Sequence, residues 1–157
     1  MNLHLHPHRQ PMPGKPPENA NRSGEHGLDL AAQTRAPGCR VMVVDDEQYA
    51  REAMALLLRQ QGYCVDVACS GPEAIELARS FDPDVVLLDI AMAGMDGFET
   101  ALRMRAAAPA DGRMRLVAVS GYGGEGFSAA CHRAGFDHCL TKPVARSTLI
   151  GLLETLR

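Results

Sequence analysis

The residues best suited to chemistry in this sequence are three aspartates, a serine and a lysine. Asp45 and Asp46 are adjacent, and Asp89 closes a run of Val and Leu. Ser120 and Lys142 each follow a further short apolar run. Carboxylates brought together repel one another, and Mg²⁺ relieves that repulsion because it prefers oxygen ligands and is often held by one or two carboxylates beside phosphoryl oxygens. The set therefore favours a magnesium-dependent reaction of a phosphoryl group, with a lysine and a hydroxyl to neutralise its oxygens.

Each of these residues also has an ordinary structural explanation when it is taken alone. An aspartate after a strand can cap a helix or open a turn, a serine can be a turn hydroxyl, and a lysine can be a solvated charge. Chemistry is favoured because the whole set is expected at the ends of four strands. In such a set Asp89 would be the nucleophile that forms an acyl phosphate.

The elements that would position these residues are short apolar runs that alternate with amphipathic segments from Arg40 onward. This alternation is typical of βα units with a parallel sheet. The expected strands are Arg40 to Val44, Tyr63 to Ala68, Val85 to Leu88, Leu116 to Val119 and Cys139 to Thr141. The expected helices carry apolar stripes within Ala50 to Leu58, from Pro72 to Ala78, and within Phe98 to Ala107, Phe127 to Ala134 and Ser147 to Leu156.

These elements predict an α/β fold, a (βα)₅ domain with a doubly wound, five-stranded parallel sheet over about residues 39 to 157. Ligands of open parallel sheets bind outside the carboxyl ends of the strands. That edge is where the three aspartates, the serine and the lysine are expected to meet.

Length and composition are those of an ordinary globular protein. The chain has 157 residues, of which 46% are hydrophobic and 22% charged. Its apolar runs are far shorter than the roughly 20 residues of a membrane span, and its first residues do not form a secretory signal. We therefore expect a cytoplasmic protein with no membrane partner.

Cysteines and net charge exclude further classes. The five cysteines are an odd number without a C-x-x-C pair, which argues against a disulfide framework and a zinc site. We expect them to be reduced and mostly in the core. A net charge of −3 without a basic block gives no support for nucleic-acid binding.

Residues 1 to 38 differ from the rest of the chain. They hold six of the ten prolines and show no sustained hydrophobic period, which predicts a disordered N-terminal tail. His4, His6 and His8 alternate in a way that could hold a metal. A polar tail is the simpler interpretation, because these histidines have no folded frame.

Four stretches resemble the CheY-like receiver domains of two-component response regulators, in order and in spacing. They are VMVVDDE at 41–47, VVLLDIAMAGMDGFE at 85–99, AVSGYG at 118–123 and AGFDHCLTKPV at 134–144. The resemblance covers essentially all of residues 39–157. It implies a flavodoxin-like fold with strand order 2-1-3-4-5.

The resemblance also implies a role for each site residue. Asp45 and Asp46 match the acidic metal-binding pair, and Asp89 matches the phospho-acceptor, which is also a metal ligand. Ser120 matches the hydroxyl that moves inward on phosphorylation, and Lys142 matches the phosphate-binding lysine.

The cofactor and partners follow from the same resemblance. The backbone carbonyl of Ala91 matches the third protein ligand of Mg²⁺. The implied function is acceptance of a phosphoryl group from a histidine kinase or a histidine phosphotransfer protein, followed by altered binding of a downstream signalling protein. The domain would catalyse its own phosphorylation and its own dephosphorylation.

Three features depart from the family pattern. Ala93 replaces the usual proline after the acceptor, which is expected to loosen that loop. Cys139 replaces the usual aromatic or histidine switch residue, which puts the usual coupling to the output face in doubt. The sequence ends after the fifth expected helix, so we expect no output domain.

Three alternatives stay open. The chain could be a pseudo-receiver that binds partners without phosphorylation, although every acidic and basic site residue is present. It could be a phosphatase with an aspartate nucleophile, although such enzymes need a second acid where Ala91 stands. It could also be a receiver fragment of a hybrid histidine kinase, with the tail as a remnant of a linker.

Overall fold

The computed structural model describes residues 38–108 and 112–156. All but the last residue of the expected tail, including His4, His6 and His8, lies outside these described residues. Five parallel strands form one sheet in the order β2-β1-β3-β4-β5, so the predicted fold class and strand order are confirmed. The strands are β1 (Arg40–Val44), β2 (Cys64–Ala68), β3 (Val85–Asp89), β4 (Arg115–Ser120) and β5 (His138–Thr141). The helices are α1 (Gln48–Gln60), α2 (Gly71–Phe81), α3 (Gly97–Ala107), α4 (Phe127–Arg133) and α5 (Arg146–Thr155).

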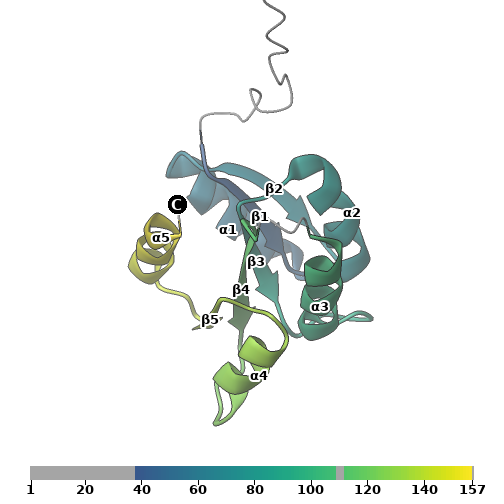
Figure 1. The fold of residues 1–157 in the computed structure, drawn as a ribbon. Coiled ribbons are helices and arrows are strands. Elements are labelled where there is room, and N and C mark those ends of the chain that lie inside the picture. The colour runs from purple at the N-terminus through teal and green to yellow at the C-terminus, as the bar shows by residue number, and fades with distance from the viewer. Residues whose placement is uncertain (1–37, 109–111, 157) are drawn as a thin grey trace, which may run out of the picture. The chain divides into compact units, whose positions relative to one another are not determined.

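Helices cover both faces of the sheet, as the doubly wound arrangement requires (Figure 1). Alternate residues of β1 show the division: Met42 packs with residues of α2, α3 and α4, whereas Val43 packs with residues of α1 and α5. The central strand β3 is buried along its whole length. Continuous Val and Leu runs suit such strands, because neither face meets water.

Side chains other than those of the expected site begin the helices nearest the carboxyl edge. The Glu47 carboxylate caps α1 by accepting hydrogen bonds from the backbone N of Tyr49 and of Ala50. The Asp96 carboxylate caps α3 by accepting from the backbone N of Glu99 at 2.8 Å. Neither Asp45 nor Asp89 is therefore needed as a helix cap.

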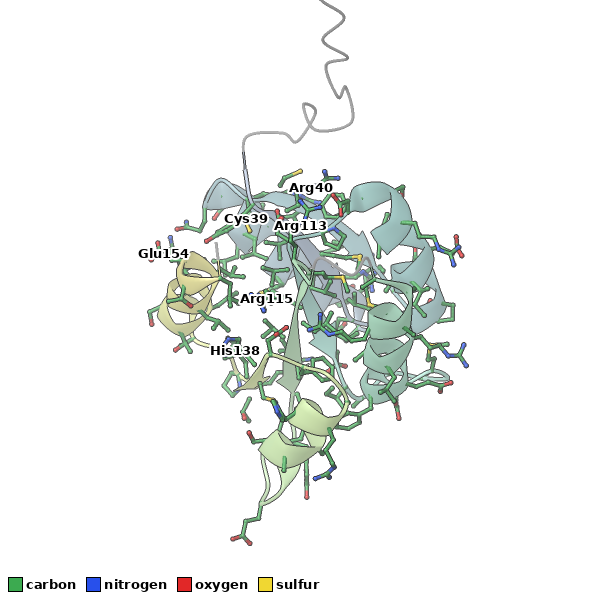
Figure 2. All side chains as sticks on the ribbon, viewed as in Figure 1. Cys39, Arg40, Arg113, Arg115, His138 and Glu154 are labelled. Carbon is green, nitrogen blue, oxygen red and sulfur yellow. The ribbon has the colours of Figure 1, made fainter. Side chains whose placement is uncertain are left out.

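Two aspartates fasten the opposite, amino edge of the sheet, which is marked by Arg40, Arg115 and His138 at the starts of β1, β4 and β5 (Figure 2). The Asp84 carboxylate accepts a 2.8 Å hydrogen bond from the backbone N of Arg40, and its carbonyl accepts a 2.8 Å bond from the backbone N of Arg115. The carboxylate of Asp137 accepts a 2.7 Å bond from the backbone N of Leu116. These contacts hold neighbouring strands in register. The register in turn fixes how the carboxyl ends of the strands line up at the opposite edge of the sheet.

The cysteines lie less deeply than expected. Cys131 is buried, Cys139 is half-buried, and Cys64 and Cys69 are exposed. The expectation that most cysteines are core residues holds in part: Cys39 and Cys139 pack against the core. Cys64, which starts the edge strand β2, and Cys69 in the loop after it do not. Cys131 and Cys139 contact each other, and burial together with the hydrogen bond to Cys139 raises the pKa of the Cys131 thiol to about 12. In the part of the chain that the structure describes, no helix has the length and apolar character needed to cross a membrane.

Candidate functional site

The structure brings the three aspartates together at the carboxyl edge of the sheet. Carboxylate oxygens of Asp45, Asp46 and Asp89 all lie within 4.8 Å of one another. Asp45 and Asp89 are each only 6% exposed, whereas Asp46 is exposed. Adjacent strands place them, since the last residues of β1 pair with the last residues of β3 in parallel register.

Backbone and side-chain donors hold the aspartate pair in place. The carboxylate of Asp45 accepts a 2.9 Å hydrogen bond from the backbone N of Glu47. Arg51 on α1 donates to the backbone carbonyl of Asp45 at 2.7 Å. The carboxylate of Asp46 accepts a 2.8 Å bond from the backbone N of Ala93.

The bond from Ala93 bears on the expectation of a loosened loop. A proline has no N–H to donate, so the alanine at this position provides a contact that the usual family residue lacks. This contact ties the loop after β3 to Asp46 on the other side of the site. The loop is thus anchored by the substitution that was expected to loosen it.

Lys142 joins two of the carboxylates. Its Nζ donates to Asp45 Oδ2 at 2.9 Å and to Asp89 Oδ1 at 3.2 Å. Burial lowers the pKa of Lys142, but the hydrogen bond to Asp45 and the charge of Asp89 raise it by more, so that the net shift is upward. The ammonium is therefore charged near neutral pH and lies between side chains that come from β1 and β3.

The carboxyl group of Asp89 has a pKa above its ordinary value. Its burial raises its pKa above the ordinary value, and the charge of Asp45 adds to this, while Lys142 acts in the opposite direction. The net shift is upward, which shows that one lysine does not fully compensate for burial and for a second carboxylate. A further positive charge at this place would favour the ionised form of Asp89.

Ser120 lies at the end of β4, next to β3 in the sheet, and is 1% exposed. Its hydroxyl oxygen accepts a 3.0 Å hydrogen bond from the backbone N of Tyr122. Its carbonyl accepts a 2.7 Å bond from the backbone N of Lys142. In this structure the hydroxyl is therefore occupied by the loop that follows β4.

Gly97 lets the first turn of α3 pack directly on the end of β3. A Cβ atom at this position would overlap the carbonyl oxygen of Asp89 and lie 2.7 Å from Cα of Ile90. The backbone N of Gly97 donates to the carbonyl of Ile90 at 3.0 Å. The backbone that carries Asp89 thus rests against a helix start where only glycine fits without displacement.

A cleft opens beside the site. It has a volume of about 730 Å³, and Asp45, Asp89 and Lys142 form its polar part. The rest of its lining is largely apolar and comes from α1, the inner faces of the strands and the segment after Lys142. The carboxylates are therefore reachable from outside although two of them are almost fully buried.

The donor set suits a hard divalent cation. The three carboxylates, two directly after β1 and one at the end of β3, place their oxygens within 4.8 Å of one another. One of them is exposed, which leaves room for water and for a substrate oxygen. Mg²⁺ is commonly held by one or two carboxylates while it keeps several waters. The residues present fit this ion.

The structure brings four of the residues predicted from the sequence into one cluster: Asp45, Asp46, Asp89 and Lys142. Ser120 lies beside this cluster, but its hydroxyl oxygen accepts from the loop after β4. Ala91 is exposed in the loop directly after β3. Cys139, at the position of the usual switch residue, is half-buried on β5.

Sequence reasoning missed Arg51 and the backbone amide of Ala93. Arg51 follows the acidic pair by about one and a half helical turns, and a basic residue at that spacing was a signal that could have been read. The contact made by the backbone amide of Ala93 could not be predicted from the sequence, since every residue except proline has a backbone N–H.

The chain is similar to known proteins both in sequence and in structure. The sequence profile of the response regulator receiver domain matches residues 41–154. The response regulator MprA of Mycolicibacterium vanbaalenii is 32% identical over 74% of this chain and 49% of its own length. The virulence sensor protein BvgS of Bordetella pertussis is 40% identical over 70% of this chain and 9% of its own length.

Among solved structures, the chemotaxis protein CheY4 of Vibrio cholerae matches with a TM-score of 0.71 and 25% identity, over 76% of this chain and 99% of that one. The chain thus spans about half of MprA and a small part of BvgS, but nearly all of CheY4. The profile match covers most of the described residues and includes all of the aspartates, the serine and the lysine of the site. The chain belongs to the response regulator receiver domain family of two-component signalling.

Proposed function

We propose that this receiver accepts a phosphoryl group on Asp89 from a phosphohistidine of a histidine kinase or a histidine phosphotransfer protein. The observation that supports this best is the contact of Lys142 with both Asp45 and Asp89 beside a third carboxylate. A purely structural ion pair needs only one acid. Here two of the three carboxylates line the cleft and the third is exposed beside them. Their mutual repulsion would be relieved by a bound cation, which would also attract a phosphoryl group.

In the proposed reaction an oxygen of the Asp89 carboxylate attacks the phosphorus atom. The new O–P bond makes an acyl phosphate, and the P–N bond of the phosphohistidine breaks with its electron pair going to the imidazole, which then takes a proton from solvent. Lys142 leaves its carboxylate partners in part and donates to a phosphoryl oxygen. Ser120 turns its hydroxyl toward another phosphoryl oxygen.

Mg²⁺ held by Asp45, Asp46 and Asp89, with the carbonyl of Ala91, would neutralise charge on the transferred group. Reversal of the modification needs water to attack phosphorus, which breaks the O–P bond and releases inorganic phosphate. Both steps are proposed as activities of the receiver itself. The outcome is altered binding of a downstream signalling protein, without nucleic acid or membrane as a direct partner.

The experiment is incubation with acetyl phosphate and Mg²⁺, followed by measurement of the intact mass. One phosphoryl group should be added, and both EDTA and Asp89→Asn should prevent it, because the ion and the nucleophile are both required. Asp96→Asn is the matched control, since Asp96 caps α3 outside the acidic cluster. An adduct that persists in Asp89→Asn would refute the assignment of the acceptor.

The alternatives predict other results. A pseudo-receiver would gain no mass while it still binds its partner. An aspartate-nucleophile phosphatase would release phosphate from phosphomonoesters, which the alanine at position 91 disfavours. A receiver derived from a longer sensor protein, as the similarity to part of BvgS suggests, would be phosphorylated in the same way, but its donor would be the kinase of that longer protein.

We further propose that the receiver domain extends over residues 39–157 and that residues 1–38 form a separate tail. The profile match over residues 41–154 supports these bounds. We also propose a cytoplasmic location. It is supported by Cys64, Cys69, Cys131 and Cys139, which are all free thiols.

A further inference from the structure

The loop between β4 and α4 carries an exposed aromatic ring beside the site. Tyr122 is 68% exposed although it lies two residues after the buried Ser120. Its ring lies across Gly124, where an added Cβ atom would come within 2.9 Å of the tyrosine hydroxyl and 3.1 Å of the ring carbon that bears it. The absence of a side chain at Gly124 therefore allows the ring to rest there.

The same ring is the outer end of a row of aromatic contacts. Tyr122 meets Phe127 edge to face with ring centroids 6.1 Å apart, and Phe127 meets Phe98 at 6.5 Å. Phe98 in turn meets Phe136 at 6.3 Å. Phe127 and Phe136 are buried, so the row leads from solvent into the core beneath α4.

A cavity lies between this ring and the acceptor strand. It has a volume of about 420 Å³, and its lining comes from the ends of β3 and β4, the loop after β4, the start of α3, and α4, and includes Ile90, Phe98, Ser120, Tyr122, Phe127 and Ala130. Cavities of roughly 150 Å³ hold benzene in other proteins, so an aromatic ring has room here. Most of the lining is apolar, which favours occupation by a ring over occupation by water.

Ser120 connects the acceptor site to this ring. Its hydroxyl oxygen accepts from the backbone N of Tyr122 at 3.0 Å. If the hydroxyl turns to a phosphoryl group on Asp89, it no longer holds that amide. The usual moving side chain of β5 is here Cys139, whose thiol is half-buried and too small to change much apolar area by rotation.

We propose that Tyr122 is the moving aromatic residue of this receiver: phosphorylation draws the Ser120 hydroxyl away from the Tyr122 amide, and the ring passes from Gly124 into the cavity beside Phe98 and Phe127. This inference rests on the proposed phosphorylation of Asp89. The movement removes an exposed ring from the surface in front of α4. A partner that reads the state of the receiver would therefore distinguish a surface with Tyr122 from one without it.

Tyrosine NMR tests this directly, because the chain has three tyrosines and no tryptophan. Tyr49 is 81% exposed and Tyr63 is 6% exposed, so they are internal references for the two extremes. The protein is labelled with ¹³C at the tyrosine ε carbons, and relaxation by a soluble gadolinium complex is measured with and without beryllofluoride and Mg²⁺. Bound beryllofluoride is detected separately by ¹⁹F NMR.

We expect the relaxation of Tyr122 to fall from near that of Tyr49 toward that of Tyr63, while both references stay unchanged. Bound beryllofluoride with an unchanged Tyr122 would overturn this inference and leave the proposed function intact. Absence of bound beryllofluoride, together with absence of a mass adduct from acetyl phosphate, would overturn the proposed function and this inference with it.

Two pairs of variants test the resting place and the destination. Gly124→Ala should push the ring off its resting place and protect it from solvent without beryllofluoride, whereas Gly121→Ala should not, since a Cβ there meets nothing within 4 Å. Ala130→Leu should fill the cavity and keep the ring exposed with beryllofluoride bound, whereas Ala129→Leu on the exposed side of α4 should not. Thermal melting of each variant confirms folding, and a folded Ala130→Leu protein in which Tyr122 still becomes protected would contradict the proposed destination.

Discussion

Lys142 contacts carboxylates from two strands, which makes it the residue where function and stability can be separated most clearly. In Lys142→Ala we expect phosphorylation by acetyl phosphate to slow by about 10²-fold, because one charged donor to the phosphoryl group is lost. The free energy of unfolding with Mg²⁺ present should change by less than about 1 kcal/mol, because the bound ion would replace the positive charge that the buried Asp45 and Asp89 lose.

Intact-mass kinetics and urea unfolding provide the two measurements. Arg79→Ala, which removes an exposed partner of Glu76, is the control for loss of a surface charge. If stability and phosphorylation fall together in Lys142→Ala, the lysine is structural and the separation proposed above is wrong.

Asp137 is the residue whose titration should affect stability away from the site. Burial raises its pKa, but the bond from the backbone N of Leu116 and the charge of Arg105 lower it by more, so that the folded pKa is below 3.8. The stabilisation is therefore complete above the unfolded value of 3.8 and is lost as the pH falls through the lower folded pKa. Asp137→Asn should reduce the free energy of unfolding by about 1 to 3 kcal/mol near pH 7, and the difference from the wild type should shrink in acid.

Urea unfolding followed from neutral pH down through the acid range checks this sign. Glu76→Gln, at an ion pair whose side chains are 64% and 71% exposed, should change stability little at any pH. If the free energies of unfolding of wild type and Asp137→Asn differ by the same amount at every pH, the charge of Asp137 does not stabilise the fold.

At the scale of single residues, the sequence predicts which side chains gather but not how each one points. Asp45, Asp89 and Lys142 could be foreseen because the end of a parallel strand fixes their position. The hydroxyl of Ser120 could not, since its direction depends on an amide of the following loop. Asp137 was not singled out either, because its donors, on α3 and at the start of β4, lie 21 to 32 residues away in the sequence.

At the scale of elements, Gly97 shows how a helix start fixes the acceptor strand. Gly97→Ala should lower the free energy of unfolding by about 1 to 3 kcal/mol, because its Cβ overlaps the backbone of β3. It should also slow phosphorylation, since the carbonyl that must move belongs to Asp89. Thermal unfolding and intact-mass kinetics measure the two effects.

Gly151 provides the matched control on another helix. It lies within α5, and a Cβ atom there meets nothing within 4 Å. Gly151→Ala should therefore stabilise the protein by about 1 kcal/mol through helix propensity, with unchanged phosphorylation. If Gly97→Ala and Gly151→Ala have the same stability and the same rate of phosphorylation, the close packing of Gly97 on β3 matters for neither property.

Helix and strand positions were predicted well, because apolar periodicity and turn residues act locally. The predicted strand from Arg40 to Val44 agrees with β1, and the other strands differ by a residue or two at their ends. The start of α3 at Gly97 lies one residue before the expected Phe98, whereas α1 starts at Gln48, two residues before its expected apolar stripe. Capping by Glu47 and Asp96 depends on which of several nearby acids reaches the first amides of each helix.

At the scale of the whole molecule, the tail is expected to contribute little to the domain. Deletion of residues 1–38 should leave the melting temperature and the rate of phosphorylation nearly unchanged, because the tail sequence has few large apolar residues that could be buried. Differential scanning calorimetry and intact-mass kinetics of the two proteins test this. A clear drop in melting temperature would show that the tail packs on the receiver.

The place of β1 between β2 and β3 has a consequence for partly folded states of the domain. β1 pairs with β2 and with β3, joining Arg40 to Cys64 and Val41 to Val85, whereas β5 pairs with β4. The loop between β4 and β5 is shorter than the loop between β1 and β3, so closure entropy does not make β5 dock late. A half-sheet of β2, β1 and β3 nevertheless needs neither β4 nor β5 for its own strand pairing. That half-sheet already carries all three carboxylates, while the lysine that offsets two of them follows β5. In any partly folded state that has this half-sheet but lacks β5, the three aspartates are therefore without the compensating charge, and their mutual repulsion opposes the closing of their own site.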